Sequence, residues 1–306
     1  MRIGTRGSAL ALAQSGHVRK LLPGGEAGNA LTVIETTGDR NPLASLRRIG
    51  GKGIFTKEID LALLERRIDL AVHSLKDLPT EEIPGLVIGA FLKREDPRDA
   101  LVSRGGVGLD ALPQGSVVGT SSLRRRSQLL ARRPDLSVEE LRGNVPTRIA
   151  RVLAGTVDAI VVATAGLHRL HMTSEISEII DESVMLPAPG QGIVAVQIRA
   201  DDEATRAALR SIHDPAAEAE ARAERSFLSV LGGGCLVPVG ARATARGGKL
   251  TLSGFVGHPD GSPSIRKSLE GEITRAAELG AELARLALAH GAREILDTVR
   301  SDEVAP

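Results

Sequence analysis

Aromatic residues are the scarcest class in this 306-residue chain, which has four Phe and neither Trp nor Tyr. Its cores must therefore be built from Ala, Val, Ile and Leu, and the length allows two or three domains. Proteins that bind single-stranded nucleic acid stack bases on aromatic side chains, so the scarcity argues against that function. A formal net charge of +1 also suggests no nucleic-acid or membrane partner.

Cysteine is nearly absent as well, since Cys235 is the only one. A single thiol forms no internal disulfide and builds no cysteine-rich zinc site. No apolar run approaches the roughly 18 residues of a membrane span, and Met1–Arg6 leads into a polar turn rather than into the apolar segment of a signal peptide. We therefore expect no metal and a cytoplasmic protein, and nothing requires more than a monomer.

Short β-branched segments alternate with helical ones through most of the chain, which is typical of α/β proteins. One helix is predicted after Ser8, which can cap it, and another after Thr56, with Ile59, Leu63 and Leu64 on one face. A third helix begins near residue 121. The predicted strands are residues 31–35, 69–72, 86–89, 116–119, 158–162 and 193–197.

The sequence pattern changes at Asp214-Pro215. Asp214 can cap a long helix that reaches about residue 231, and Pro215 can be its first residue. Two short strands at 250–252 and 255–256 and a helix at 276–290 follow it. The fold class we predict is α/β, with two periplasmic-binding-protein-like domains around a cleft and a smaller α+β C-terminal domain. The predicted domain bounds are 1–93 with 193–212 for domain 1, 97–190 for domain 2, and 214–306 for domain 3.

Basic residues follow hydroxyl-bearing helix starts at three places in the sequence, Thr5–Ser8, Ser121–Arg126 and Arg142–Arg148. Free backbone N–H groups at a helix start attract anions, and neighbouring arginines reinforce that attraction. Each segment alone could equally be a cap followed by a solvated basic face. Three of them together favour a binding site for a polyanion.

Three further segments carry candidate chemistry. His73–Pro79 follows a predicted buried strand, so Lys76 and Asp77 could point into a cleft, whereas His73 fits a structural role better. Gly50–Phe55 is glycine-rich but lacks the spacing of a phosphate-binding loop, so we interpret it as a mobile flap before the helix that follows Thr56. Cys235 follows three glycines, a poor place for packing and a good one for presenting a nucleophile.

Taken together, these segments resemble the hydroxymethylbilane synthase (porphobilinogen deaminase) family of tetrapyrrole biosynthesis. The resemblance runs from Arg2 to about Ile295. Its motif blocks are Thr5–Ser8, Gly50–Phe55, Ala71–Asp77, Arg94–Asp99, Gly119–Arg125, Leu141–Arg148, Ala165–Leu170, Pro189–Gly192 and Gly233–Pro238.

The resemblance implies a transferase that condenses four porphobilinogen molecules head to tail and releases ammonia at each step. It implies a dipyrromethane cofactor, held as a thioether on Cys235, that primes the chain. Each pyrrole carries an acetate and a propionate, which would explain the arginines. Asp77 would be the catalytic carboxylate, because it can stabilise positive charge on a pyrrole nitrogen and shuttle protons.

The resemblance also assigns binding roles residue by residue. Cofactor-binding residues would be Cys235, Lys76, Asp77, Thr120, Ser121, Ser122, Arg124, Arg125 and Arg148. Substrate-binding residues would be Arg6, Ser8, Gln14, Lys52, Phe55, Arg142, Arg148, Arg169 and Gln191.

Two other classes of protein stay open at this stage. A solute-binding protein with two α/β lobes would grip an anion without needing Cys235 or a third domain. A phosphate-handling transferase could use the arginine clusters, although a phosphate-binding loop and a metal-carboxylate grouping are missing. The mass of the Cys235 peptide would separate these classes from the synthase.

Overall fold

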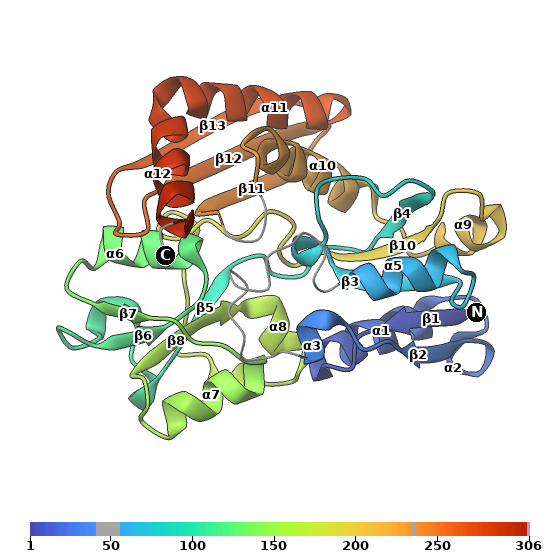
Figure 1. Ribbon diagram of the computed structural model, residues 1–306, viewed down its shortest axis with the longest axis horizontal. Coiled ribbons are helices and arrows are strands. Elements are labelled where there is room, and N and C mark those ends of the chain that lie inside the picture. Colours follow the sequence, from blue (N-terminus) through green and yellow to red (C-terminus); the bar gives the residue numbers. More distant parts are fainter. Residues whose placement is uncertain (41–55, 234–236, 305–306) are drawn as a thin grey trace. The chain divides into compact units, whose positions relative to one another are not determined.

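The first five-stranded sheet combines four strands from the N-terminal part of the chain with one strand from much later in the sequence (Figure 1). A computed structural model describes residues 1–40, 56–233 and 237–304. The strands of this sheet lie in the order β2 (Ala30–Val33), β1 (Arg2–Thr5), β3 (Leu70–Ser74), β10 (Val194–Arg199) and β4 (Leu86–Phe91). The strand β1 pairs in parallel with β2 and β3, whereas β10 runs antiparallel to both β3 and β4.

The second five-stranded sheet repeats that plan. Its strands lie in the order β7 (Ser137–Glu139), β6 (Val117–Gly119), β8 (Ala159–Ala163), β5 (Asp99–Ser103) and β9 (Glu178–Ile179). The strand β6 pairs in parallel with β7 and β8, and β5 runs antiparallel to β8 and β9. In each sheet the antiparallel strand in the fourth place is the first strand after the chain passes from one unit to the other.

The third sheet is wholly antiparallel and belongs to the C-terminal part. Its strands are β11 (Val239–Arg246), β12 (Lys249–Gly257) and β13 (Ser264–Glu272), in that order. By their contacts, residues Met1–Glu95 and Gly192–Glu218 form one compact unit (unit 1), and Asp96–Gln191 with Ala219–Pro306 form another (unit 2). The predicted α/β class, with two sheet domains and a smaller three-stranded one, is confirmed; the predicted domain bounds stay a prediction.

Helices connect and cover these strands (Figure 1). Those of unit 1 are α1 (Ala9–Leu21), α2 (Gly25–Gly28), α3 (Thr37–Arg40), α5 (Lys57–Leu64) and α9 (Glu203–Leu209). The sheet of β5–β9 has α6 (Leu123–Arg132), α7 (Val145–Leu153) and α8 (Thr164–Arg169). The C-terminal part has α10 (Pro215–Val230), α11 (Ala276–Ala287) and α12 (Arg293–Val304). None of the helices described is long and apolar enough to cross a membrane.

Two of the predicted helix caps are confirmed by hydrogen bonds. Ser8 Oγ accepts from Ala11 N at 3.3 Å, and Asp214 Oδ1 accepts from Ala217 N at 2.9 Å, with Pro215 as the first residue of α10. Both caps satisfy a backbone N–H that has no partner inside the helix.

Three local predictions are wrong. Thr56 precedes α5 without a side-chain cap, and Leu64 is 43% exposed because it lies about 100° around the helix from the buried Leu63. The two strands expected at 250–252 and 255–256 are one strand, β12. The strand continues through Gly254, where the missing side chain makes room for the ring of Phe227.

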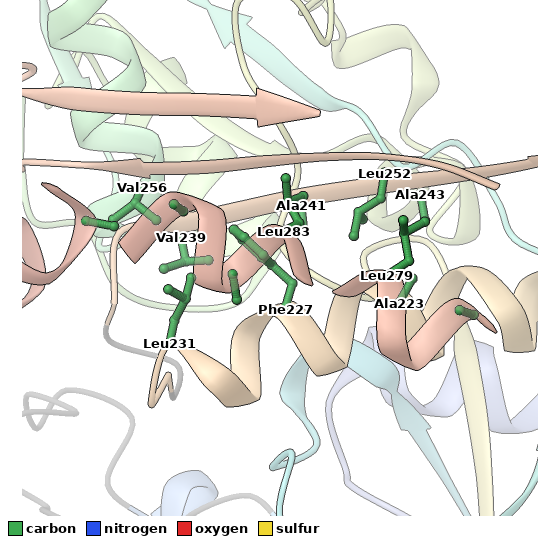
Figure 2. Packing of buried hydrophobic residues seen from close by; sticks show 14 of the residues in the cluster. Ala223, Phe227, Leu231, Val239, Ala241, Ala243, Leu252, Val256, Leu279 and Leu283 are labelled. Atoms are coloured by element: carbon green, nitrogen blue, oxygen red, sulfur yellow. The ribbon is translucent and has the colours of Figure 1, made fainter. Parts of the chain in front are cut away.

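The core of the C-terminal part shows how a chain with few aromatics packs. Figure 2 shows Phe227 of α10 and Leu283 of α11 lying against the sheet, with small side chains such as Ala241 around them. A Cβ atom at Gly254 would lie 2.5 Å from Phe227 Cζ, so glycine is needed there. One aromatic ring thus fills the space that aliphatic side chains leave.

Candidate functional site

The turn between β6 and α6 uses three hydroxyl groups in succession. Ser122 is the N-cap of α6, and its Oγ accepts from Arg125 N at 3.5 Å. Thr120 Oγ1 accepts from Ser122 N at 3.2 Å, and Ser121 Oγ donates to the Leu141 carbonyl oxygen at 2.7 Å. These bonds fix the turn and begin the helix at the place where the sequence predicts an anion site. The cofactor-binding roles of the three residues stay predictions.

Arg124 and Arg125, the next charged residues, both turn inward to Asp99 at the start of β5. Arg124 Nη1 donates to Asp99 Oδ2 at 2.7 Å, and Arg125 Nη2 donates to Asp99 Oδ1 at 2.7 Å. Gln191 Nε2 adds a third partner, donating to Asp99 Oδ1 at 2.9 Å. Asp99 is wholly buried and the two arginines nearly so. Two of the three arginines predicted to bind the cofactor, Arg124 and Arg125, therefore share one carboxylate of the chain itself.

The electrostatics of this cluster follow from its burial and its partners. Burial alone would raise the pKa of Asp99, but the charges and hydrogen bonds of Arg124 and Arg125 outweigh it and hold the pKa well below its usual range. Burial lowers the pKa of Arg124, and the charge of Asp99 opposes that effect. An arginine stays charged under such conditions. The cluster therefore holds two positive charges against one negative charge.

Arg148 of α7 adds further positive charge in unit 2. Asn144 caps α7 by accepting from Thr147 N at 2.9 Å, and Arg148 Nε donates to the Gly143 carbonyl oxygen at 2.8 Å. Burial, followed by the charges of Arg125 and Arg142, lowers the pKa of Arg148 to about 10. Within the ranges described, no carboxylate forms an ion pair with Arg148.

Two other predicted substrate-binding arginines lie in unit 2. Arg142 Nε donates to Glu140 Oε1 at 2.8 Å, so it has a carboxylate partner. Arg169 is the last residue of α8 and is half-buried. Gln191, also predicted to bind substrate, is buried and donates through Nε2 to the Pro97 carbonyl oxygen as well as to Asp99. All three roles stay predictions.

The predicted catalytic residue, Asp77, ends a single 3-10 turn (Leu75–Asp77) directly after β3. Its side chain is neither fully buried nor fully exposed, and Lys76 beside it is half-buried too. Considering residues 1–40, 56–233 and 237–304, the Asp77 carboxylate makes no hydrogen bond or ion pair. A carboxylate in this state can accept protons or hydrogen bonds from a ligand.

Other unit 1 residues predicted to bind substrate are held by neighbours. Gln14 of α1 donates through Nε2 to Ser74 Oγ, at the end of β3, at 2.8 Å. Arg6 pairs with Asp39 at 2.6 Å, and this pairing, against the effect of burial, lowers the pKa of Asp39. Ser8 is engaged as the cap of α1. Cys235, Lys52 and Phe55 lie outside the residues that the structure describes.

Unit 1 buries polar residues on β3, β10 and α5, of which only His73 was predicted. His73 is buried, as expected of a structural histidine, and its Nε2 lies 3.1 Å from Gln197 Oε1 on β10. Burial lowers the pKa of His73 to about 4, so the ring is neutral near pH 7. Asp60 of α5 is buried nearby, and burial raises its pKa. Sequence periodicity marks Asp60 as a polar residue on a helix and gives no sign of these partners.

Asp99 is a buried charged residue of the candidate site to which sequence reasoning gave no role. It is the last residue of the motif block Arg94–Asp99, but neither its sequence position nor the resemblance assigned it a role. Its partners lie 25, 26 and 92 positions away in the chain, so no local pattern connects them. Searching the described part of the chain finds no group of three or more His, Cys, Asp and Glu residues placed to hold a metal ion.

Fold and site together define an α/β protein whose second unit places arginines at helix starts, two of them paired with one buried carboxylate. Two family domains match the chain. Residues 1–207 match porphobilinogen deaminase, dipyromethane cofactor binding domain, and residues 219–289 match porphobilinogen deaminase, C-terminal domain.

Curated relatives agree with the two family domains along the whole chain. Porphobilinogen deaminase of Brevibacillus brevis is 48% identical over 99% of this chain and 98% of its own length. Those of Deinococcus radiodurans and Thermus thermophilus are each 48% identical, over 97% of this chain and 98% of theirs. The chain belongs to the porphobilinogen deaminase family.

Among solved structures, the Bordetella pertussis BvgS periplasmic VFT2 domain is similar, with a TM-score of 0.39 and 15% identity, over 69% of this chain and 86% of that one. A ligand-binding component of an ABC-type import system from Staphylococcus aureus gives a TM-score of 0.38 and 12% identity, over 75% and 74%. Because both TM-scores are below 0.5, we base the description of the architecture on the strand order of the chain itself.

Proposed function

We propose that this chain is a hydroxymethylbilane synthase, which joins four porphobilinogen molecules head to tail. In each joining step the bond from the aminomethyl carbon to nitrogen breaks, ammonia leaves, and a carbon–carbon bond forms to a pyrrole carbon that loses its proton. A bound dipyrromethane would supply the pyrrole carbon from which growth starts. Full-length identity of 48% to curated members of the family supports this activity.

One observation in the structure carries the proposal: the cluster of Arg124 and Arg125 holds two positive charges against the single negative charge of Asp99. Arg124 and Arg125 are buried and Arg148 is half-buried, and Asp99 is the carboxylate that pairs with the first two. Buried charges are stable when they are paired, so this arrangement favours a ligand that brings carboxylates. A dipyrromethane brings an acetate and a propionate on each ring, and thus fits the donors present.

Within this function we propose the following roles. Arg124, Arg125, Arg148, Lys76 and the hydroxyls of residues 120–122 would bind the carboxylates of the cofactor, which is attached to Cys235. Arg6, Ser8, Gln14, Arg142, Arg169 and Gln191, with Lys52 and Phe55, would bind porphobilinogen or the growing end. Asp77 would stabilise positive charge on the ring nitrogen as ammonia leaves, and would carry protons to the amine and from the coupled ring.

The direct test is a turnover assay on the purified chain with porphobilinogen. We expect one ammonia released for each porphobilinogen consumed, and a linear tetrapyrrole as product. Cys235→Ser should abolish sustained turnover while the protein stays folded, as circular dichroism would report. Wild-type protein that releases no ammonia, or Cys235→Ser protein that is as active as wild type, would contradict the proposal.

We also propose that the enzyme works as a cytoplasmic monomer with porphobilinogen as its partner, and without nucleic acid or membrane. The absence of a membrane-spanning helix from the described residues is compatible with this, and the net charge of +1 favours it. Sedimentation of the active enzyme at several concentrations tests the oligomeric state. A concentration-dependent dimer that is needed for activity would count against it.

A further inference from the structure

Asp99 is bonded more fully than an ordinary counter-ion. Its Oδ1 accepts from Arg125 Nε at 3.2 Å, from Arg125 Nη2 at 2.7 Å and from Gln191 Nε2 at 2.9 Å, and its Oδ2 accepts from Arg124 Nη1 at 2.7 Å. Successive helix residues normally point about 100° apart. A shared carboxylate on β5 brings both guanidinium groups of α6 to one place.

Backbone carbonyls complete the orientation of the two guanidinium groups. Arg124 Nη1 also donates to the Leu186 carbonyl oxygen at 2.6 Å, and Arg125 Nη1 donates to the Val161 carbonyl oxygen at 2.9 Å. Among the described residues, Arg124 therefore donates only through Nη1. Its Nε and Nη2 form the edge of a guanidinium that can hold a carboxylate by two parallel hydrogen bonds.

The strand plan itself does not require an acid at this position. Asp99 is the first residue of β5 and pairs with Ala163, the last residue of β8. In the other five-stranded sheet the corresponding residue is Val194, the first of β10, which pairs with Ser74 at the end of β3. Buried ion clusters are seldom more stable than apolar packing of the same volume. A role in ligand binding explains the acid better than a role in stability.

We propose that Asp99 is a positioning residue for the anion site of unit 2. It holds Arg124 and Arg125, with the help of Gln191, so that the Nε–Nη2 edge of Arg124 binds the acetate and propionate groups of the dipyrromethane, together with the second N–H group on each Nη atom of Arg125. The inference rests on the proposed function and adds a residue that acts through the arginines rather than on the reacting atoms.

The test measures how fast cofactor-free chain acquires its primer from porphobilinogen, by a time course of intact mass. In Asp99→Asn the arginines keep their charges but lose their fixed orientation. Since misplacing a binding group by about 1 Å can cost on the order of 100-fold, we expect loading per folded chain to slow at least tenfold. A purely structural role would instead lower the amount of folded protein and leave the loading rate of the folded fraction unchanged.

Asp110→Asn is the matched control. Asp110 pairs with Arg132 at 2.6 Å, so the variant makes the same chemical change at another arginine of α6, but on the surface. Its loading rate should stay within about twofold of wild type, because exposed ion pairs contribute little. Equal loading rates for Asp99→Asn, Asp110→Asn and wild type would overturn the proposal.

Asp99→Asn could fail to fold, and two milder variants then decide. Asp99→Glu keeps the carboxylate but displaces it by one methylene, and Gln191→Met removes one of the hydrogen bonds to Asp99. We expect both to load more slowly than wild type, with KM for porphobilinogen rising more than kcat falls in the loaded fraction. If both fold and load at the wild-type rate, the inference is wrong. Wild-type chain that acquires no primer at all would refute the proposed function instead.

Discussion

The two five-stranded sheets share a strand plan, but they bury different kinds of polar group. On β3 and β10 of unit 1, His73 and Gln197 face each other as neutral groups, with His73 Nε2 3.1 Å from Gln197 Oε1. In unit 2, Asp99 at the start of β5 pairs with two arginines of α6. One architecture therefore tolerates a neutral pair or a charged cluster.

We infer from this difference that the charged cluster around Asp99 serves ligand binding rather than the stability of the sheet. Val194 occupies the position of Asp99 in the first sheet and is equally buried there. Apolar packing thus suffices for the strand.

Asp77→Asn should give the largest effect, since it removes the one carboxylate to which we assign the chemistry. Turnover should fall by about 100-fold or more, the range in which general acid–base groups act. The variant should still carry the dipyrromethane, because the arginines of unit 2 are intact. Steady-state rates and intact mass measured on one preparation check both parts, and near-normal turnover would contradict the role of Asp77.

Val194→Asp should destabilise unit 1 severely, because it puts the acid of unit 2 where no arginine pair has been provided. An unpaired buried charge costs about 3–5 kcal/mol. Val194→Thr, of similar shape but uncharged, is the control and should lose much less. Urea unfolding of the three proteins tests this, and equal midpoints for Val194→Asp and wild type would show that the two positions do not differ as we infer.

Acid should weaken the two units in different pH ranges. Burial, and to a lesser degree the charge of Arg6, lowers the pKa of His73 to about 4, whereas an unfolded histidine titrates near 6.5. The unfolded state then binds the proton first, so stability falls by up to roughly 3 kcal/mol as pH drops from about 6.5 to about 4. The pKa of Asp99 is lowered, so its contribution is lost only below about pH 4.

Hydrogen exchange followed through the strands of each sheet between pH 7 and pH 4 measures this difference. Unit 1 should lose protection first, and His73→Gln should remove much of that loss. Asp60 acts in the opposite direction, because burial raises its pKa, so the histidine variant is compared with wild type at each pH. Equal loss of protection in both sheets would contradict the assignment.

The helix caps should give the smallest effects. Ser8→Ala and Ser122→Ala each remove a side chain that accepts a backbone N–H, which costs about 1 kcal/mol. Thermal unfolding should therefore move by similar amounts in both variants. Only Ser122→Ala should also slow loading of the primer, since Ser8 is proposed to serve incoming substrate. Slower loading in both variants, or in neither, would contradict the assignment of Ser122 to the cofactor and of Ser8 to incoming substrate.

Much of the fold could be predicted because its signals are local. Ser8 and Asp214 mark helix starts through their own cap bonds, and the strand of β10 stands out as an apolar run. Other elements carry weaker signals. The strand β1 is four residues long and contains a glycine, and β13 alternates half-buried and exposed residues rich in charge, so neither was predicted.

The candidate site divides in the same way. Motifs near helix starts predicted Ser122, Arg124, Arg125 and Arg148, and resemblance supplied their roles. The partnership with Asp99 depends on contacts between strands, helix and a distant glutamine, which only the folded chain brings together. Thr56 and Leu64 were mispredicted because a cap and a buried face depend on turn geometry and on tertiary neighbours as well as on spacing.

We propose that the arginines of unit 2 hold a dipyrromethane that is anchored on Cys235. The most direct measurement is the mass of the Cys235 peptide from protein made with ample porphobilinogen. We predict a peptide that carries the mass of a dipyrromethane in wild type, and that carries less of it in Arg124→Leu and Arg125→Leu. An unmodified Cys235 peptide in wild-type protein would contradict the account.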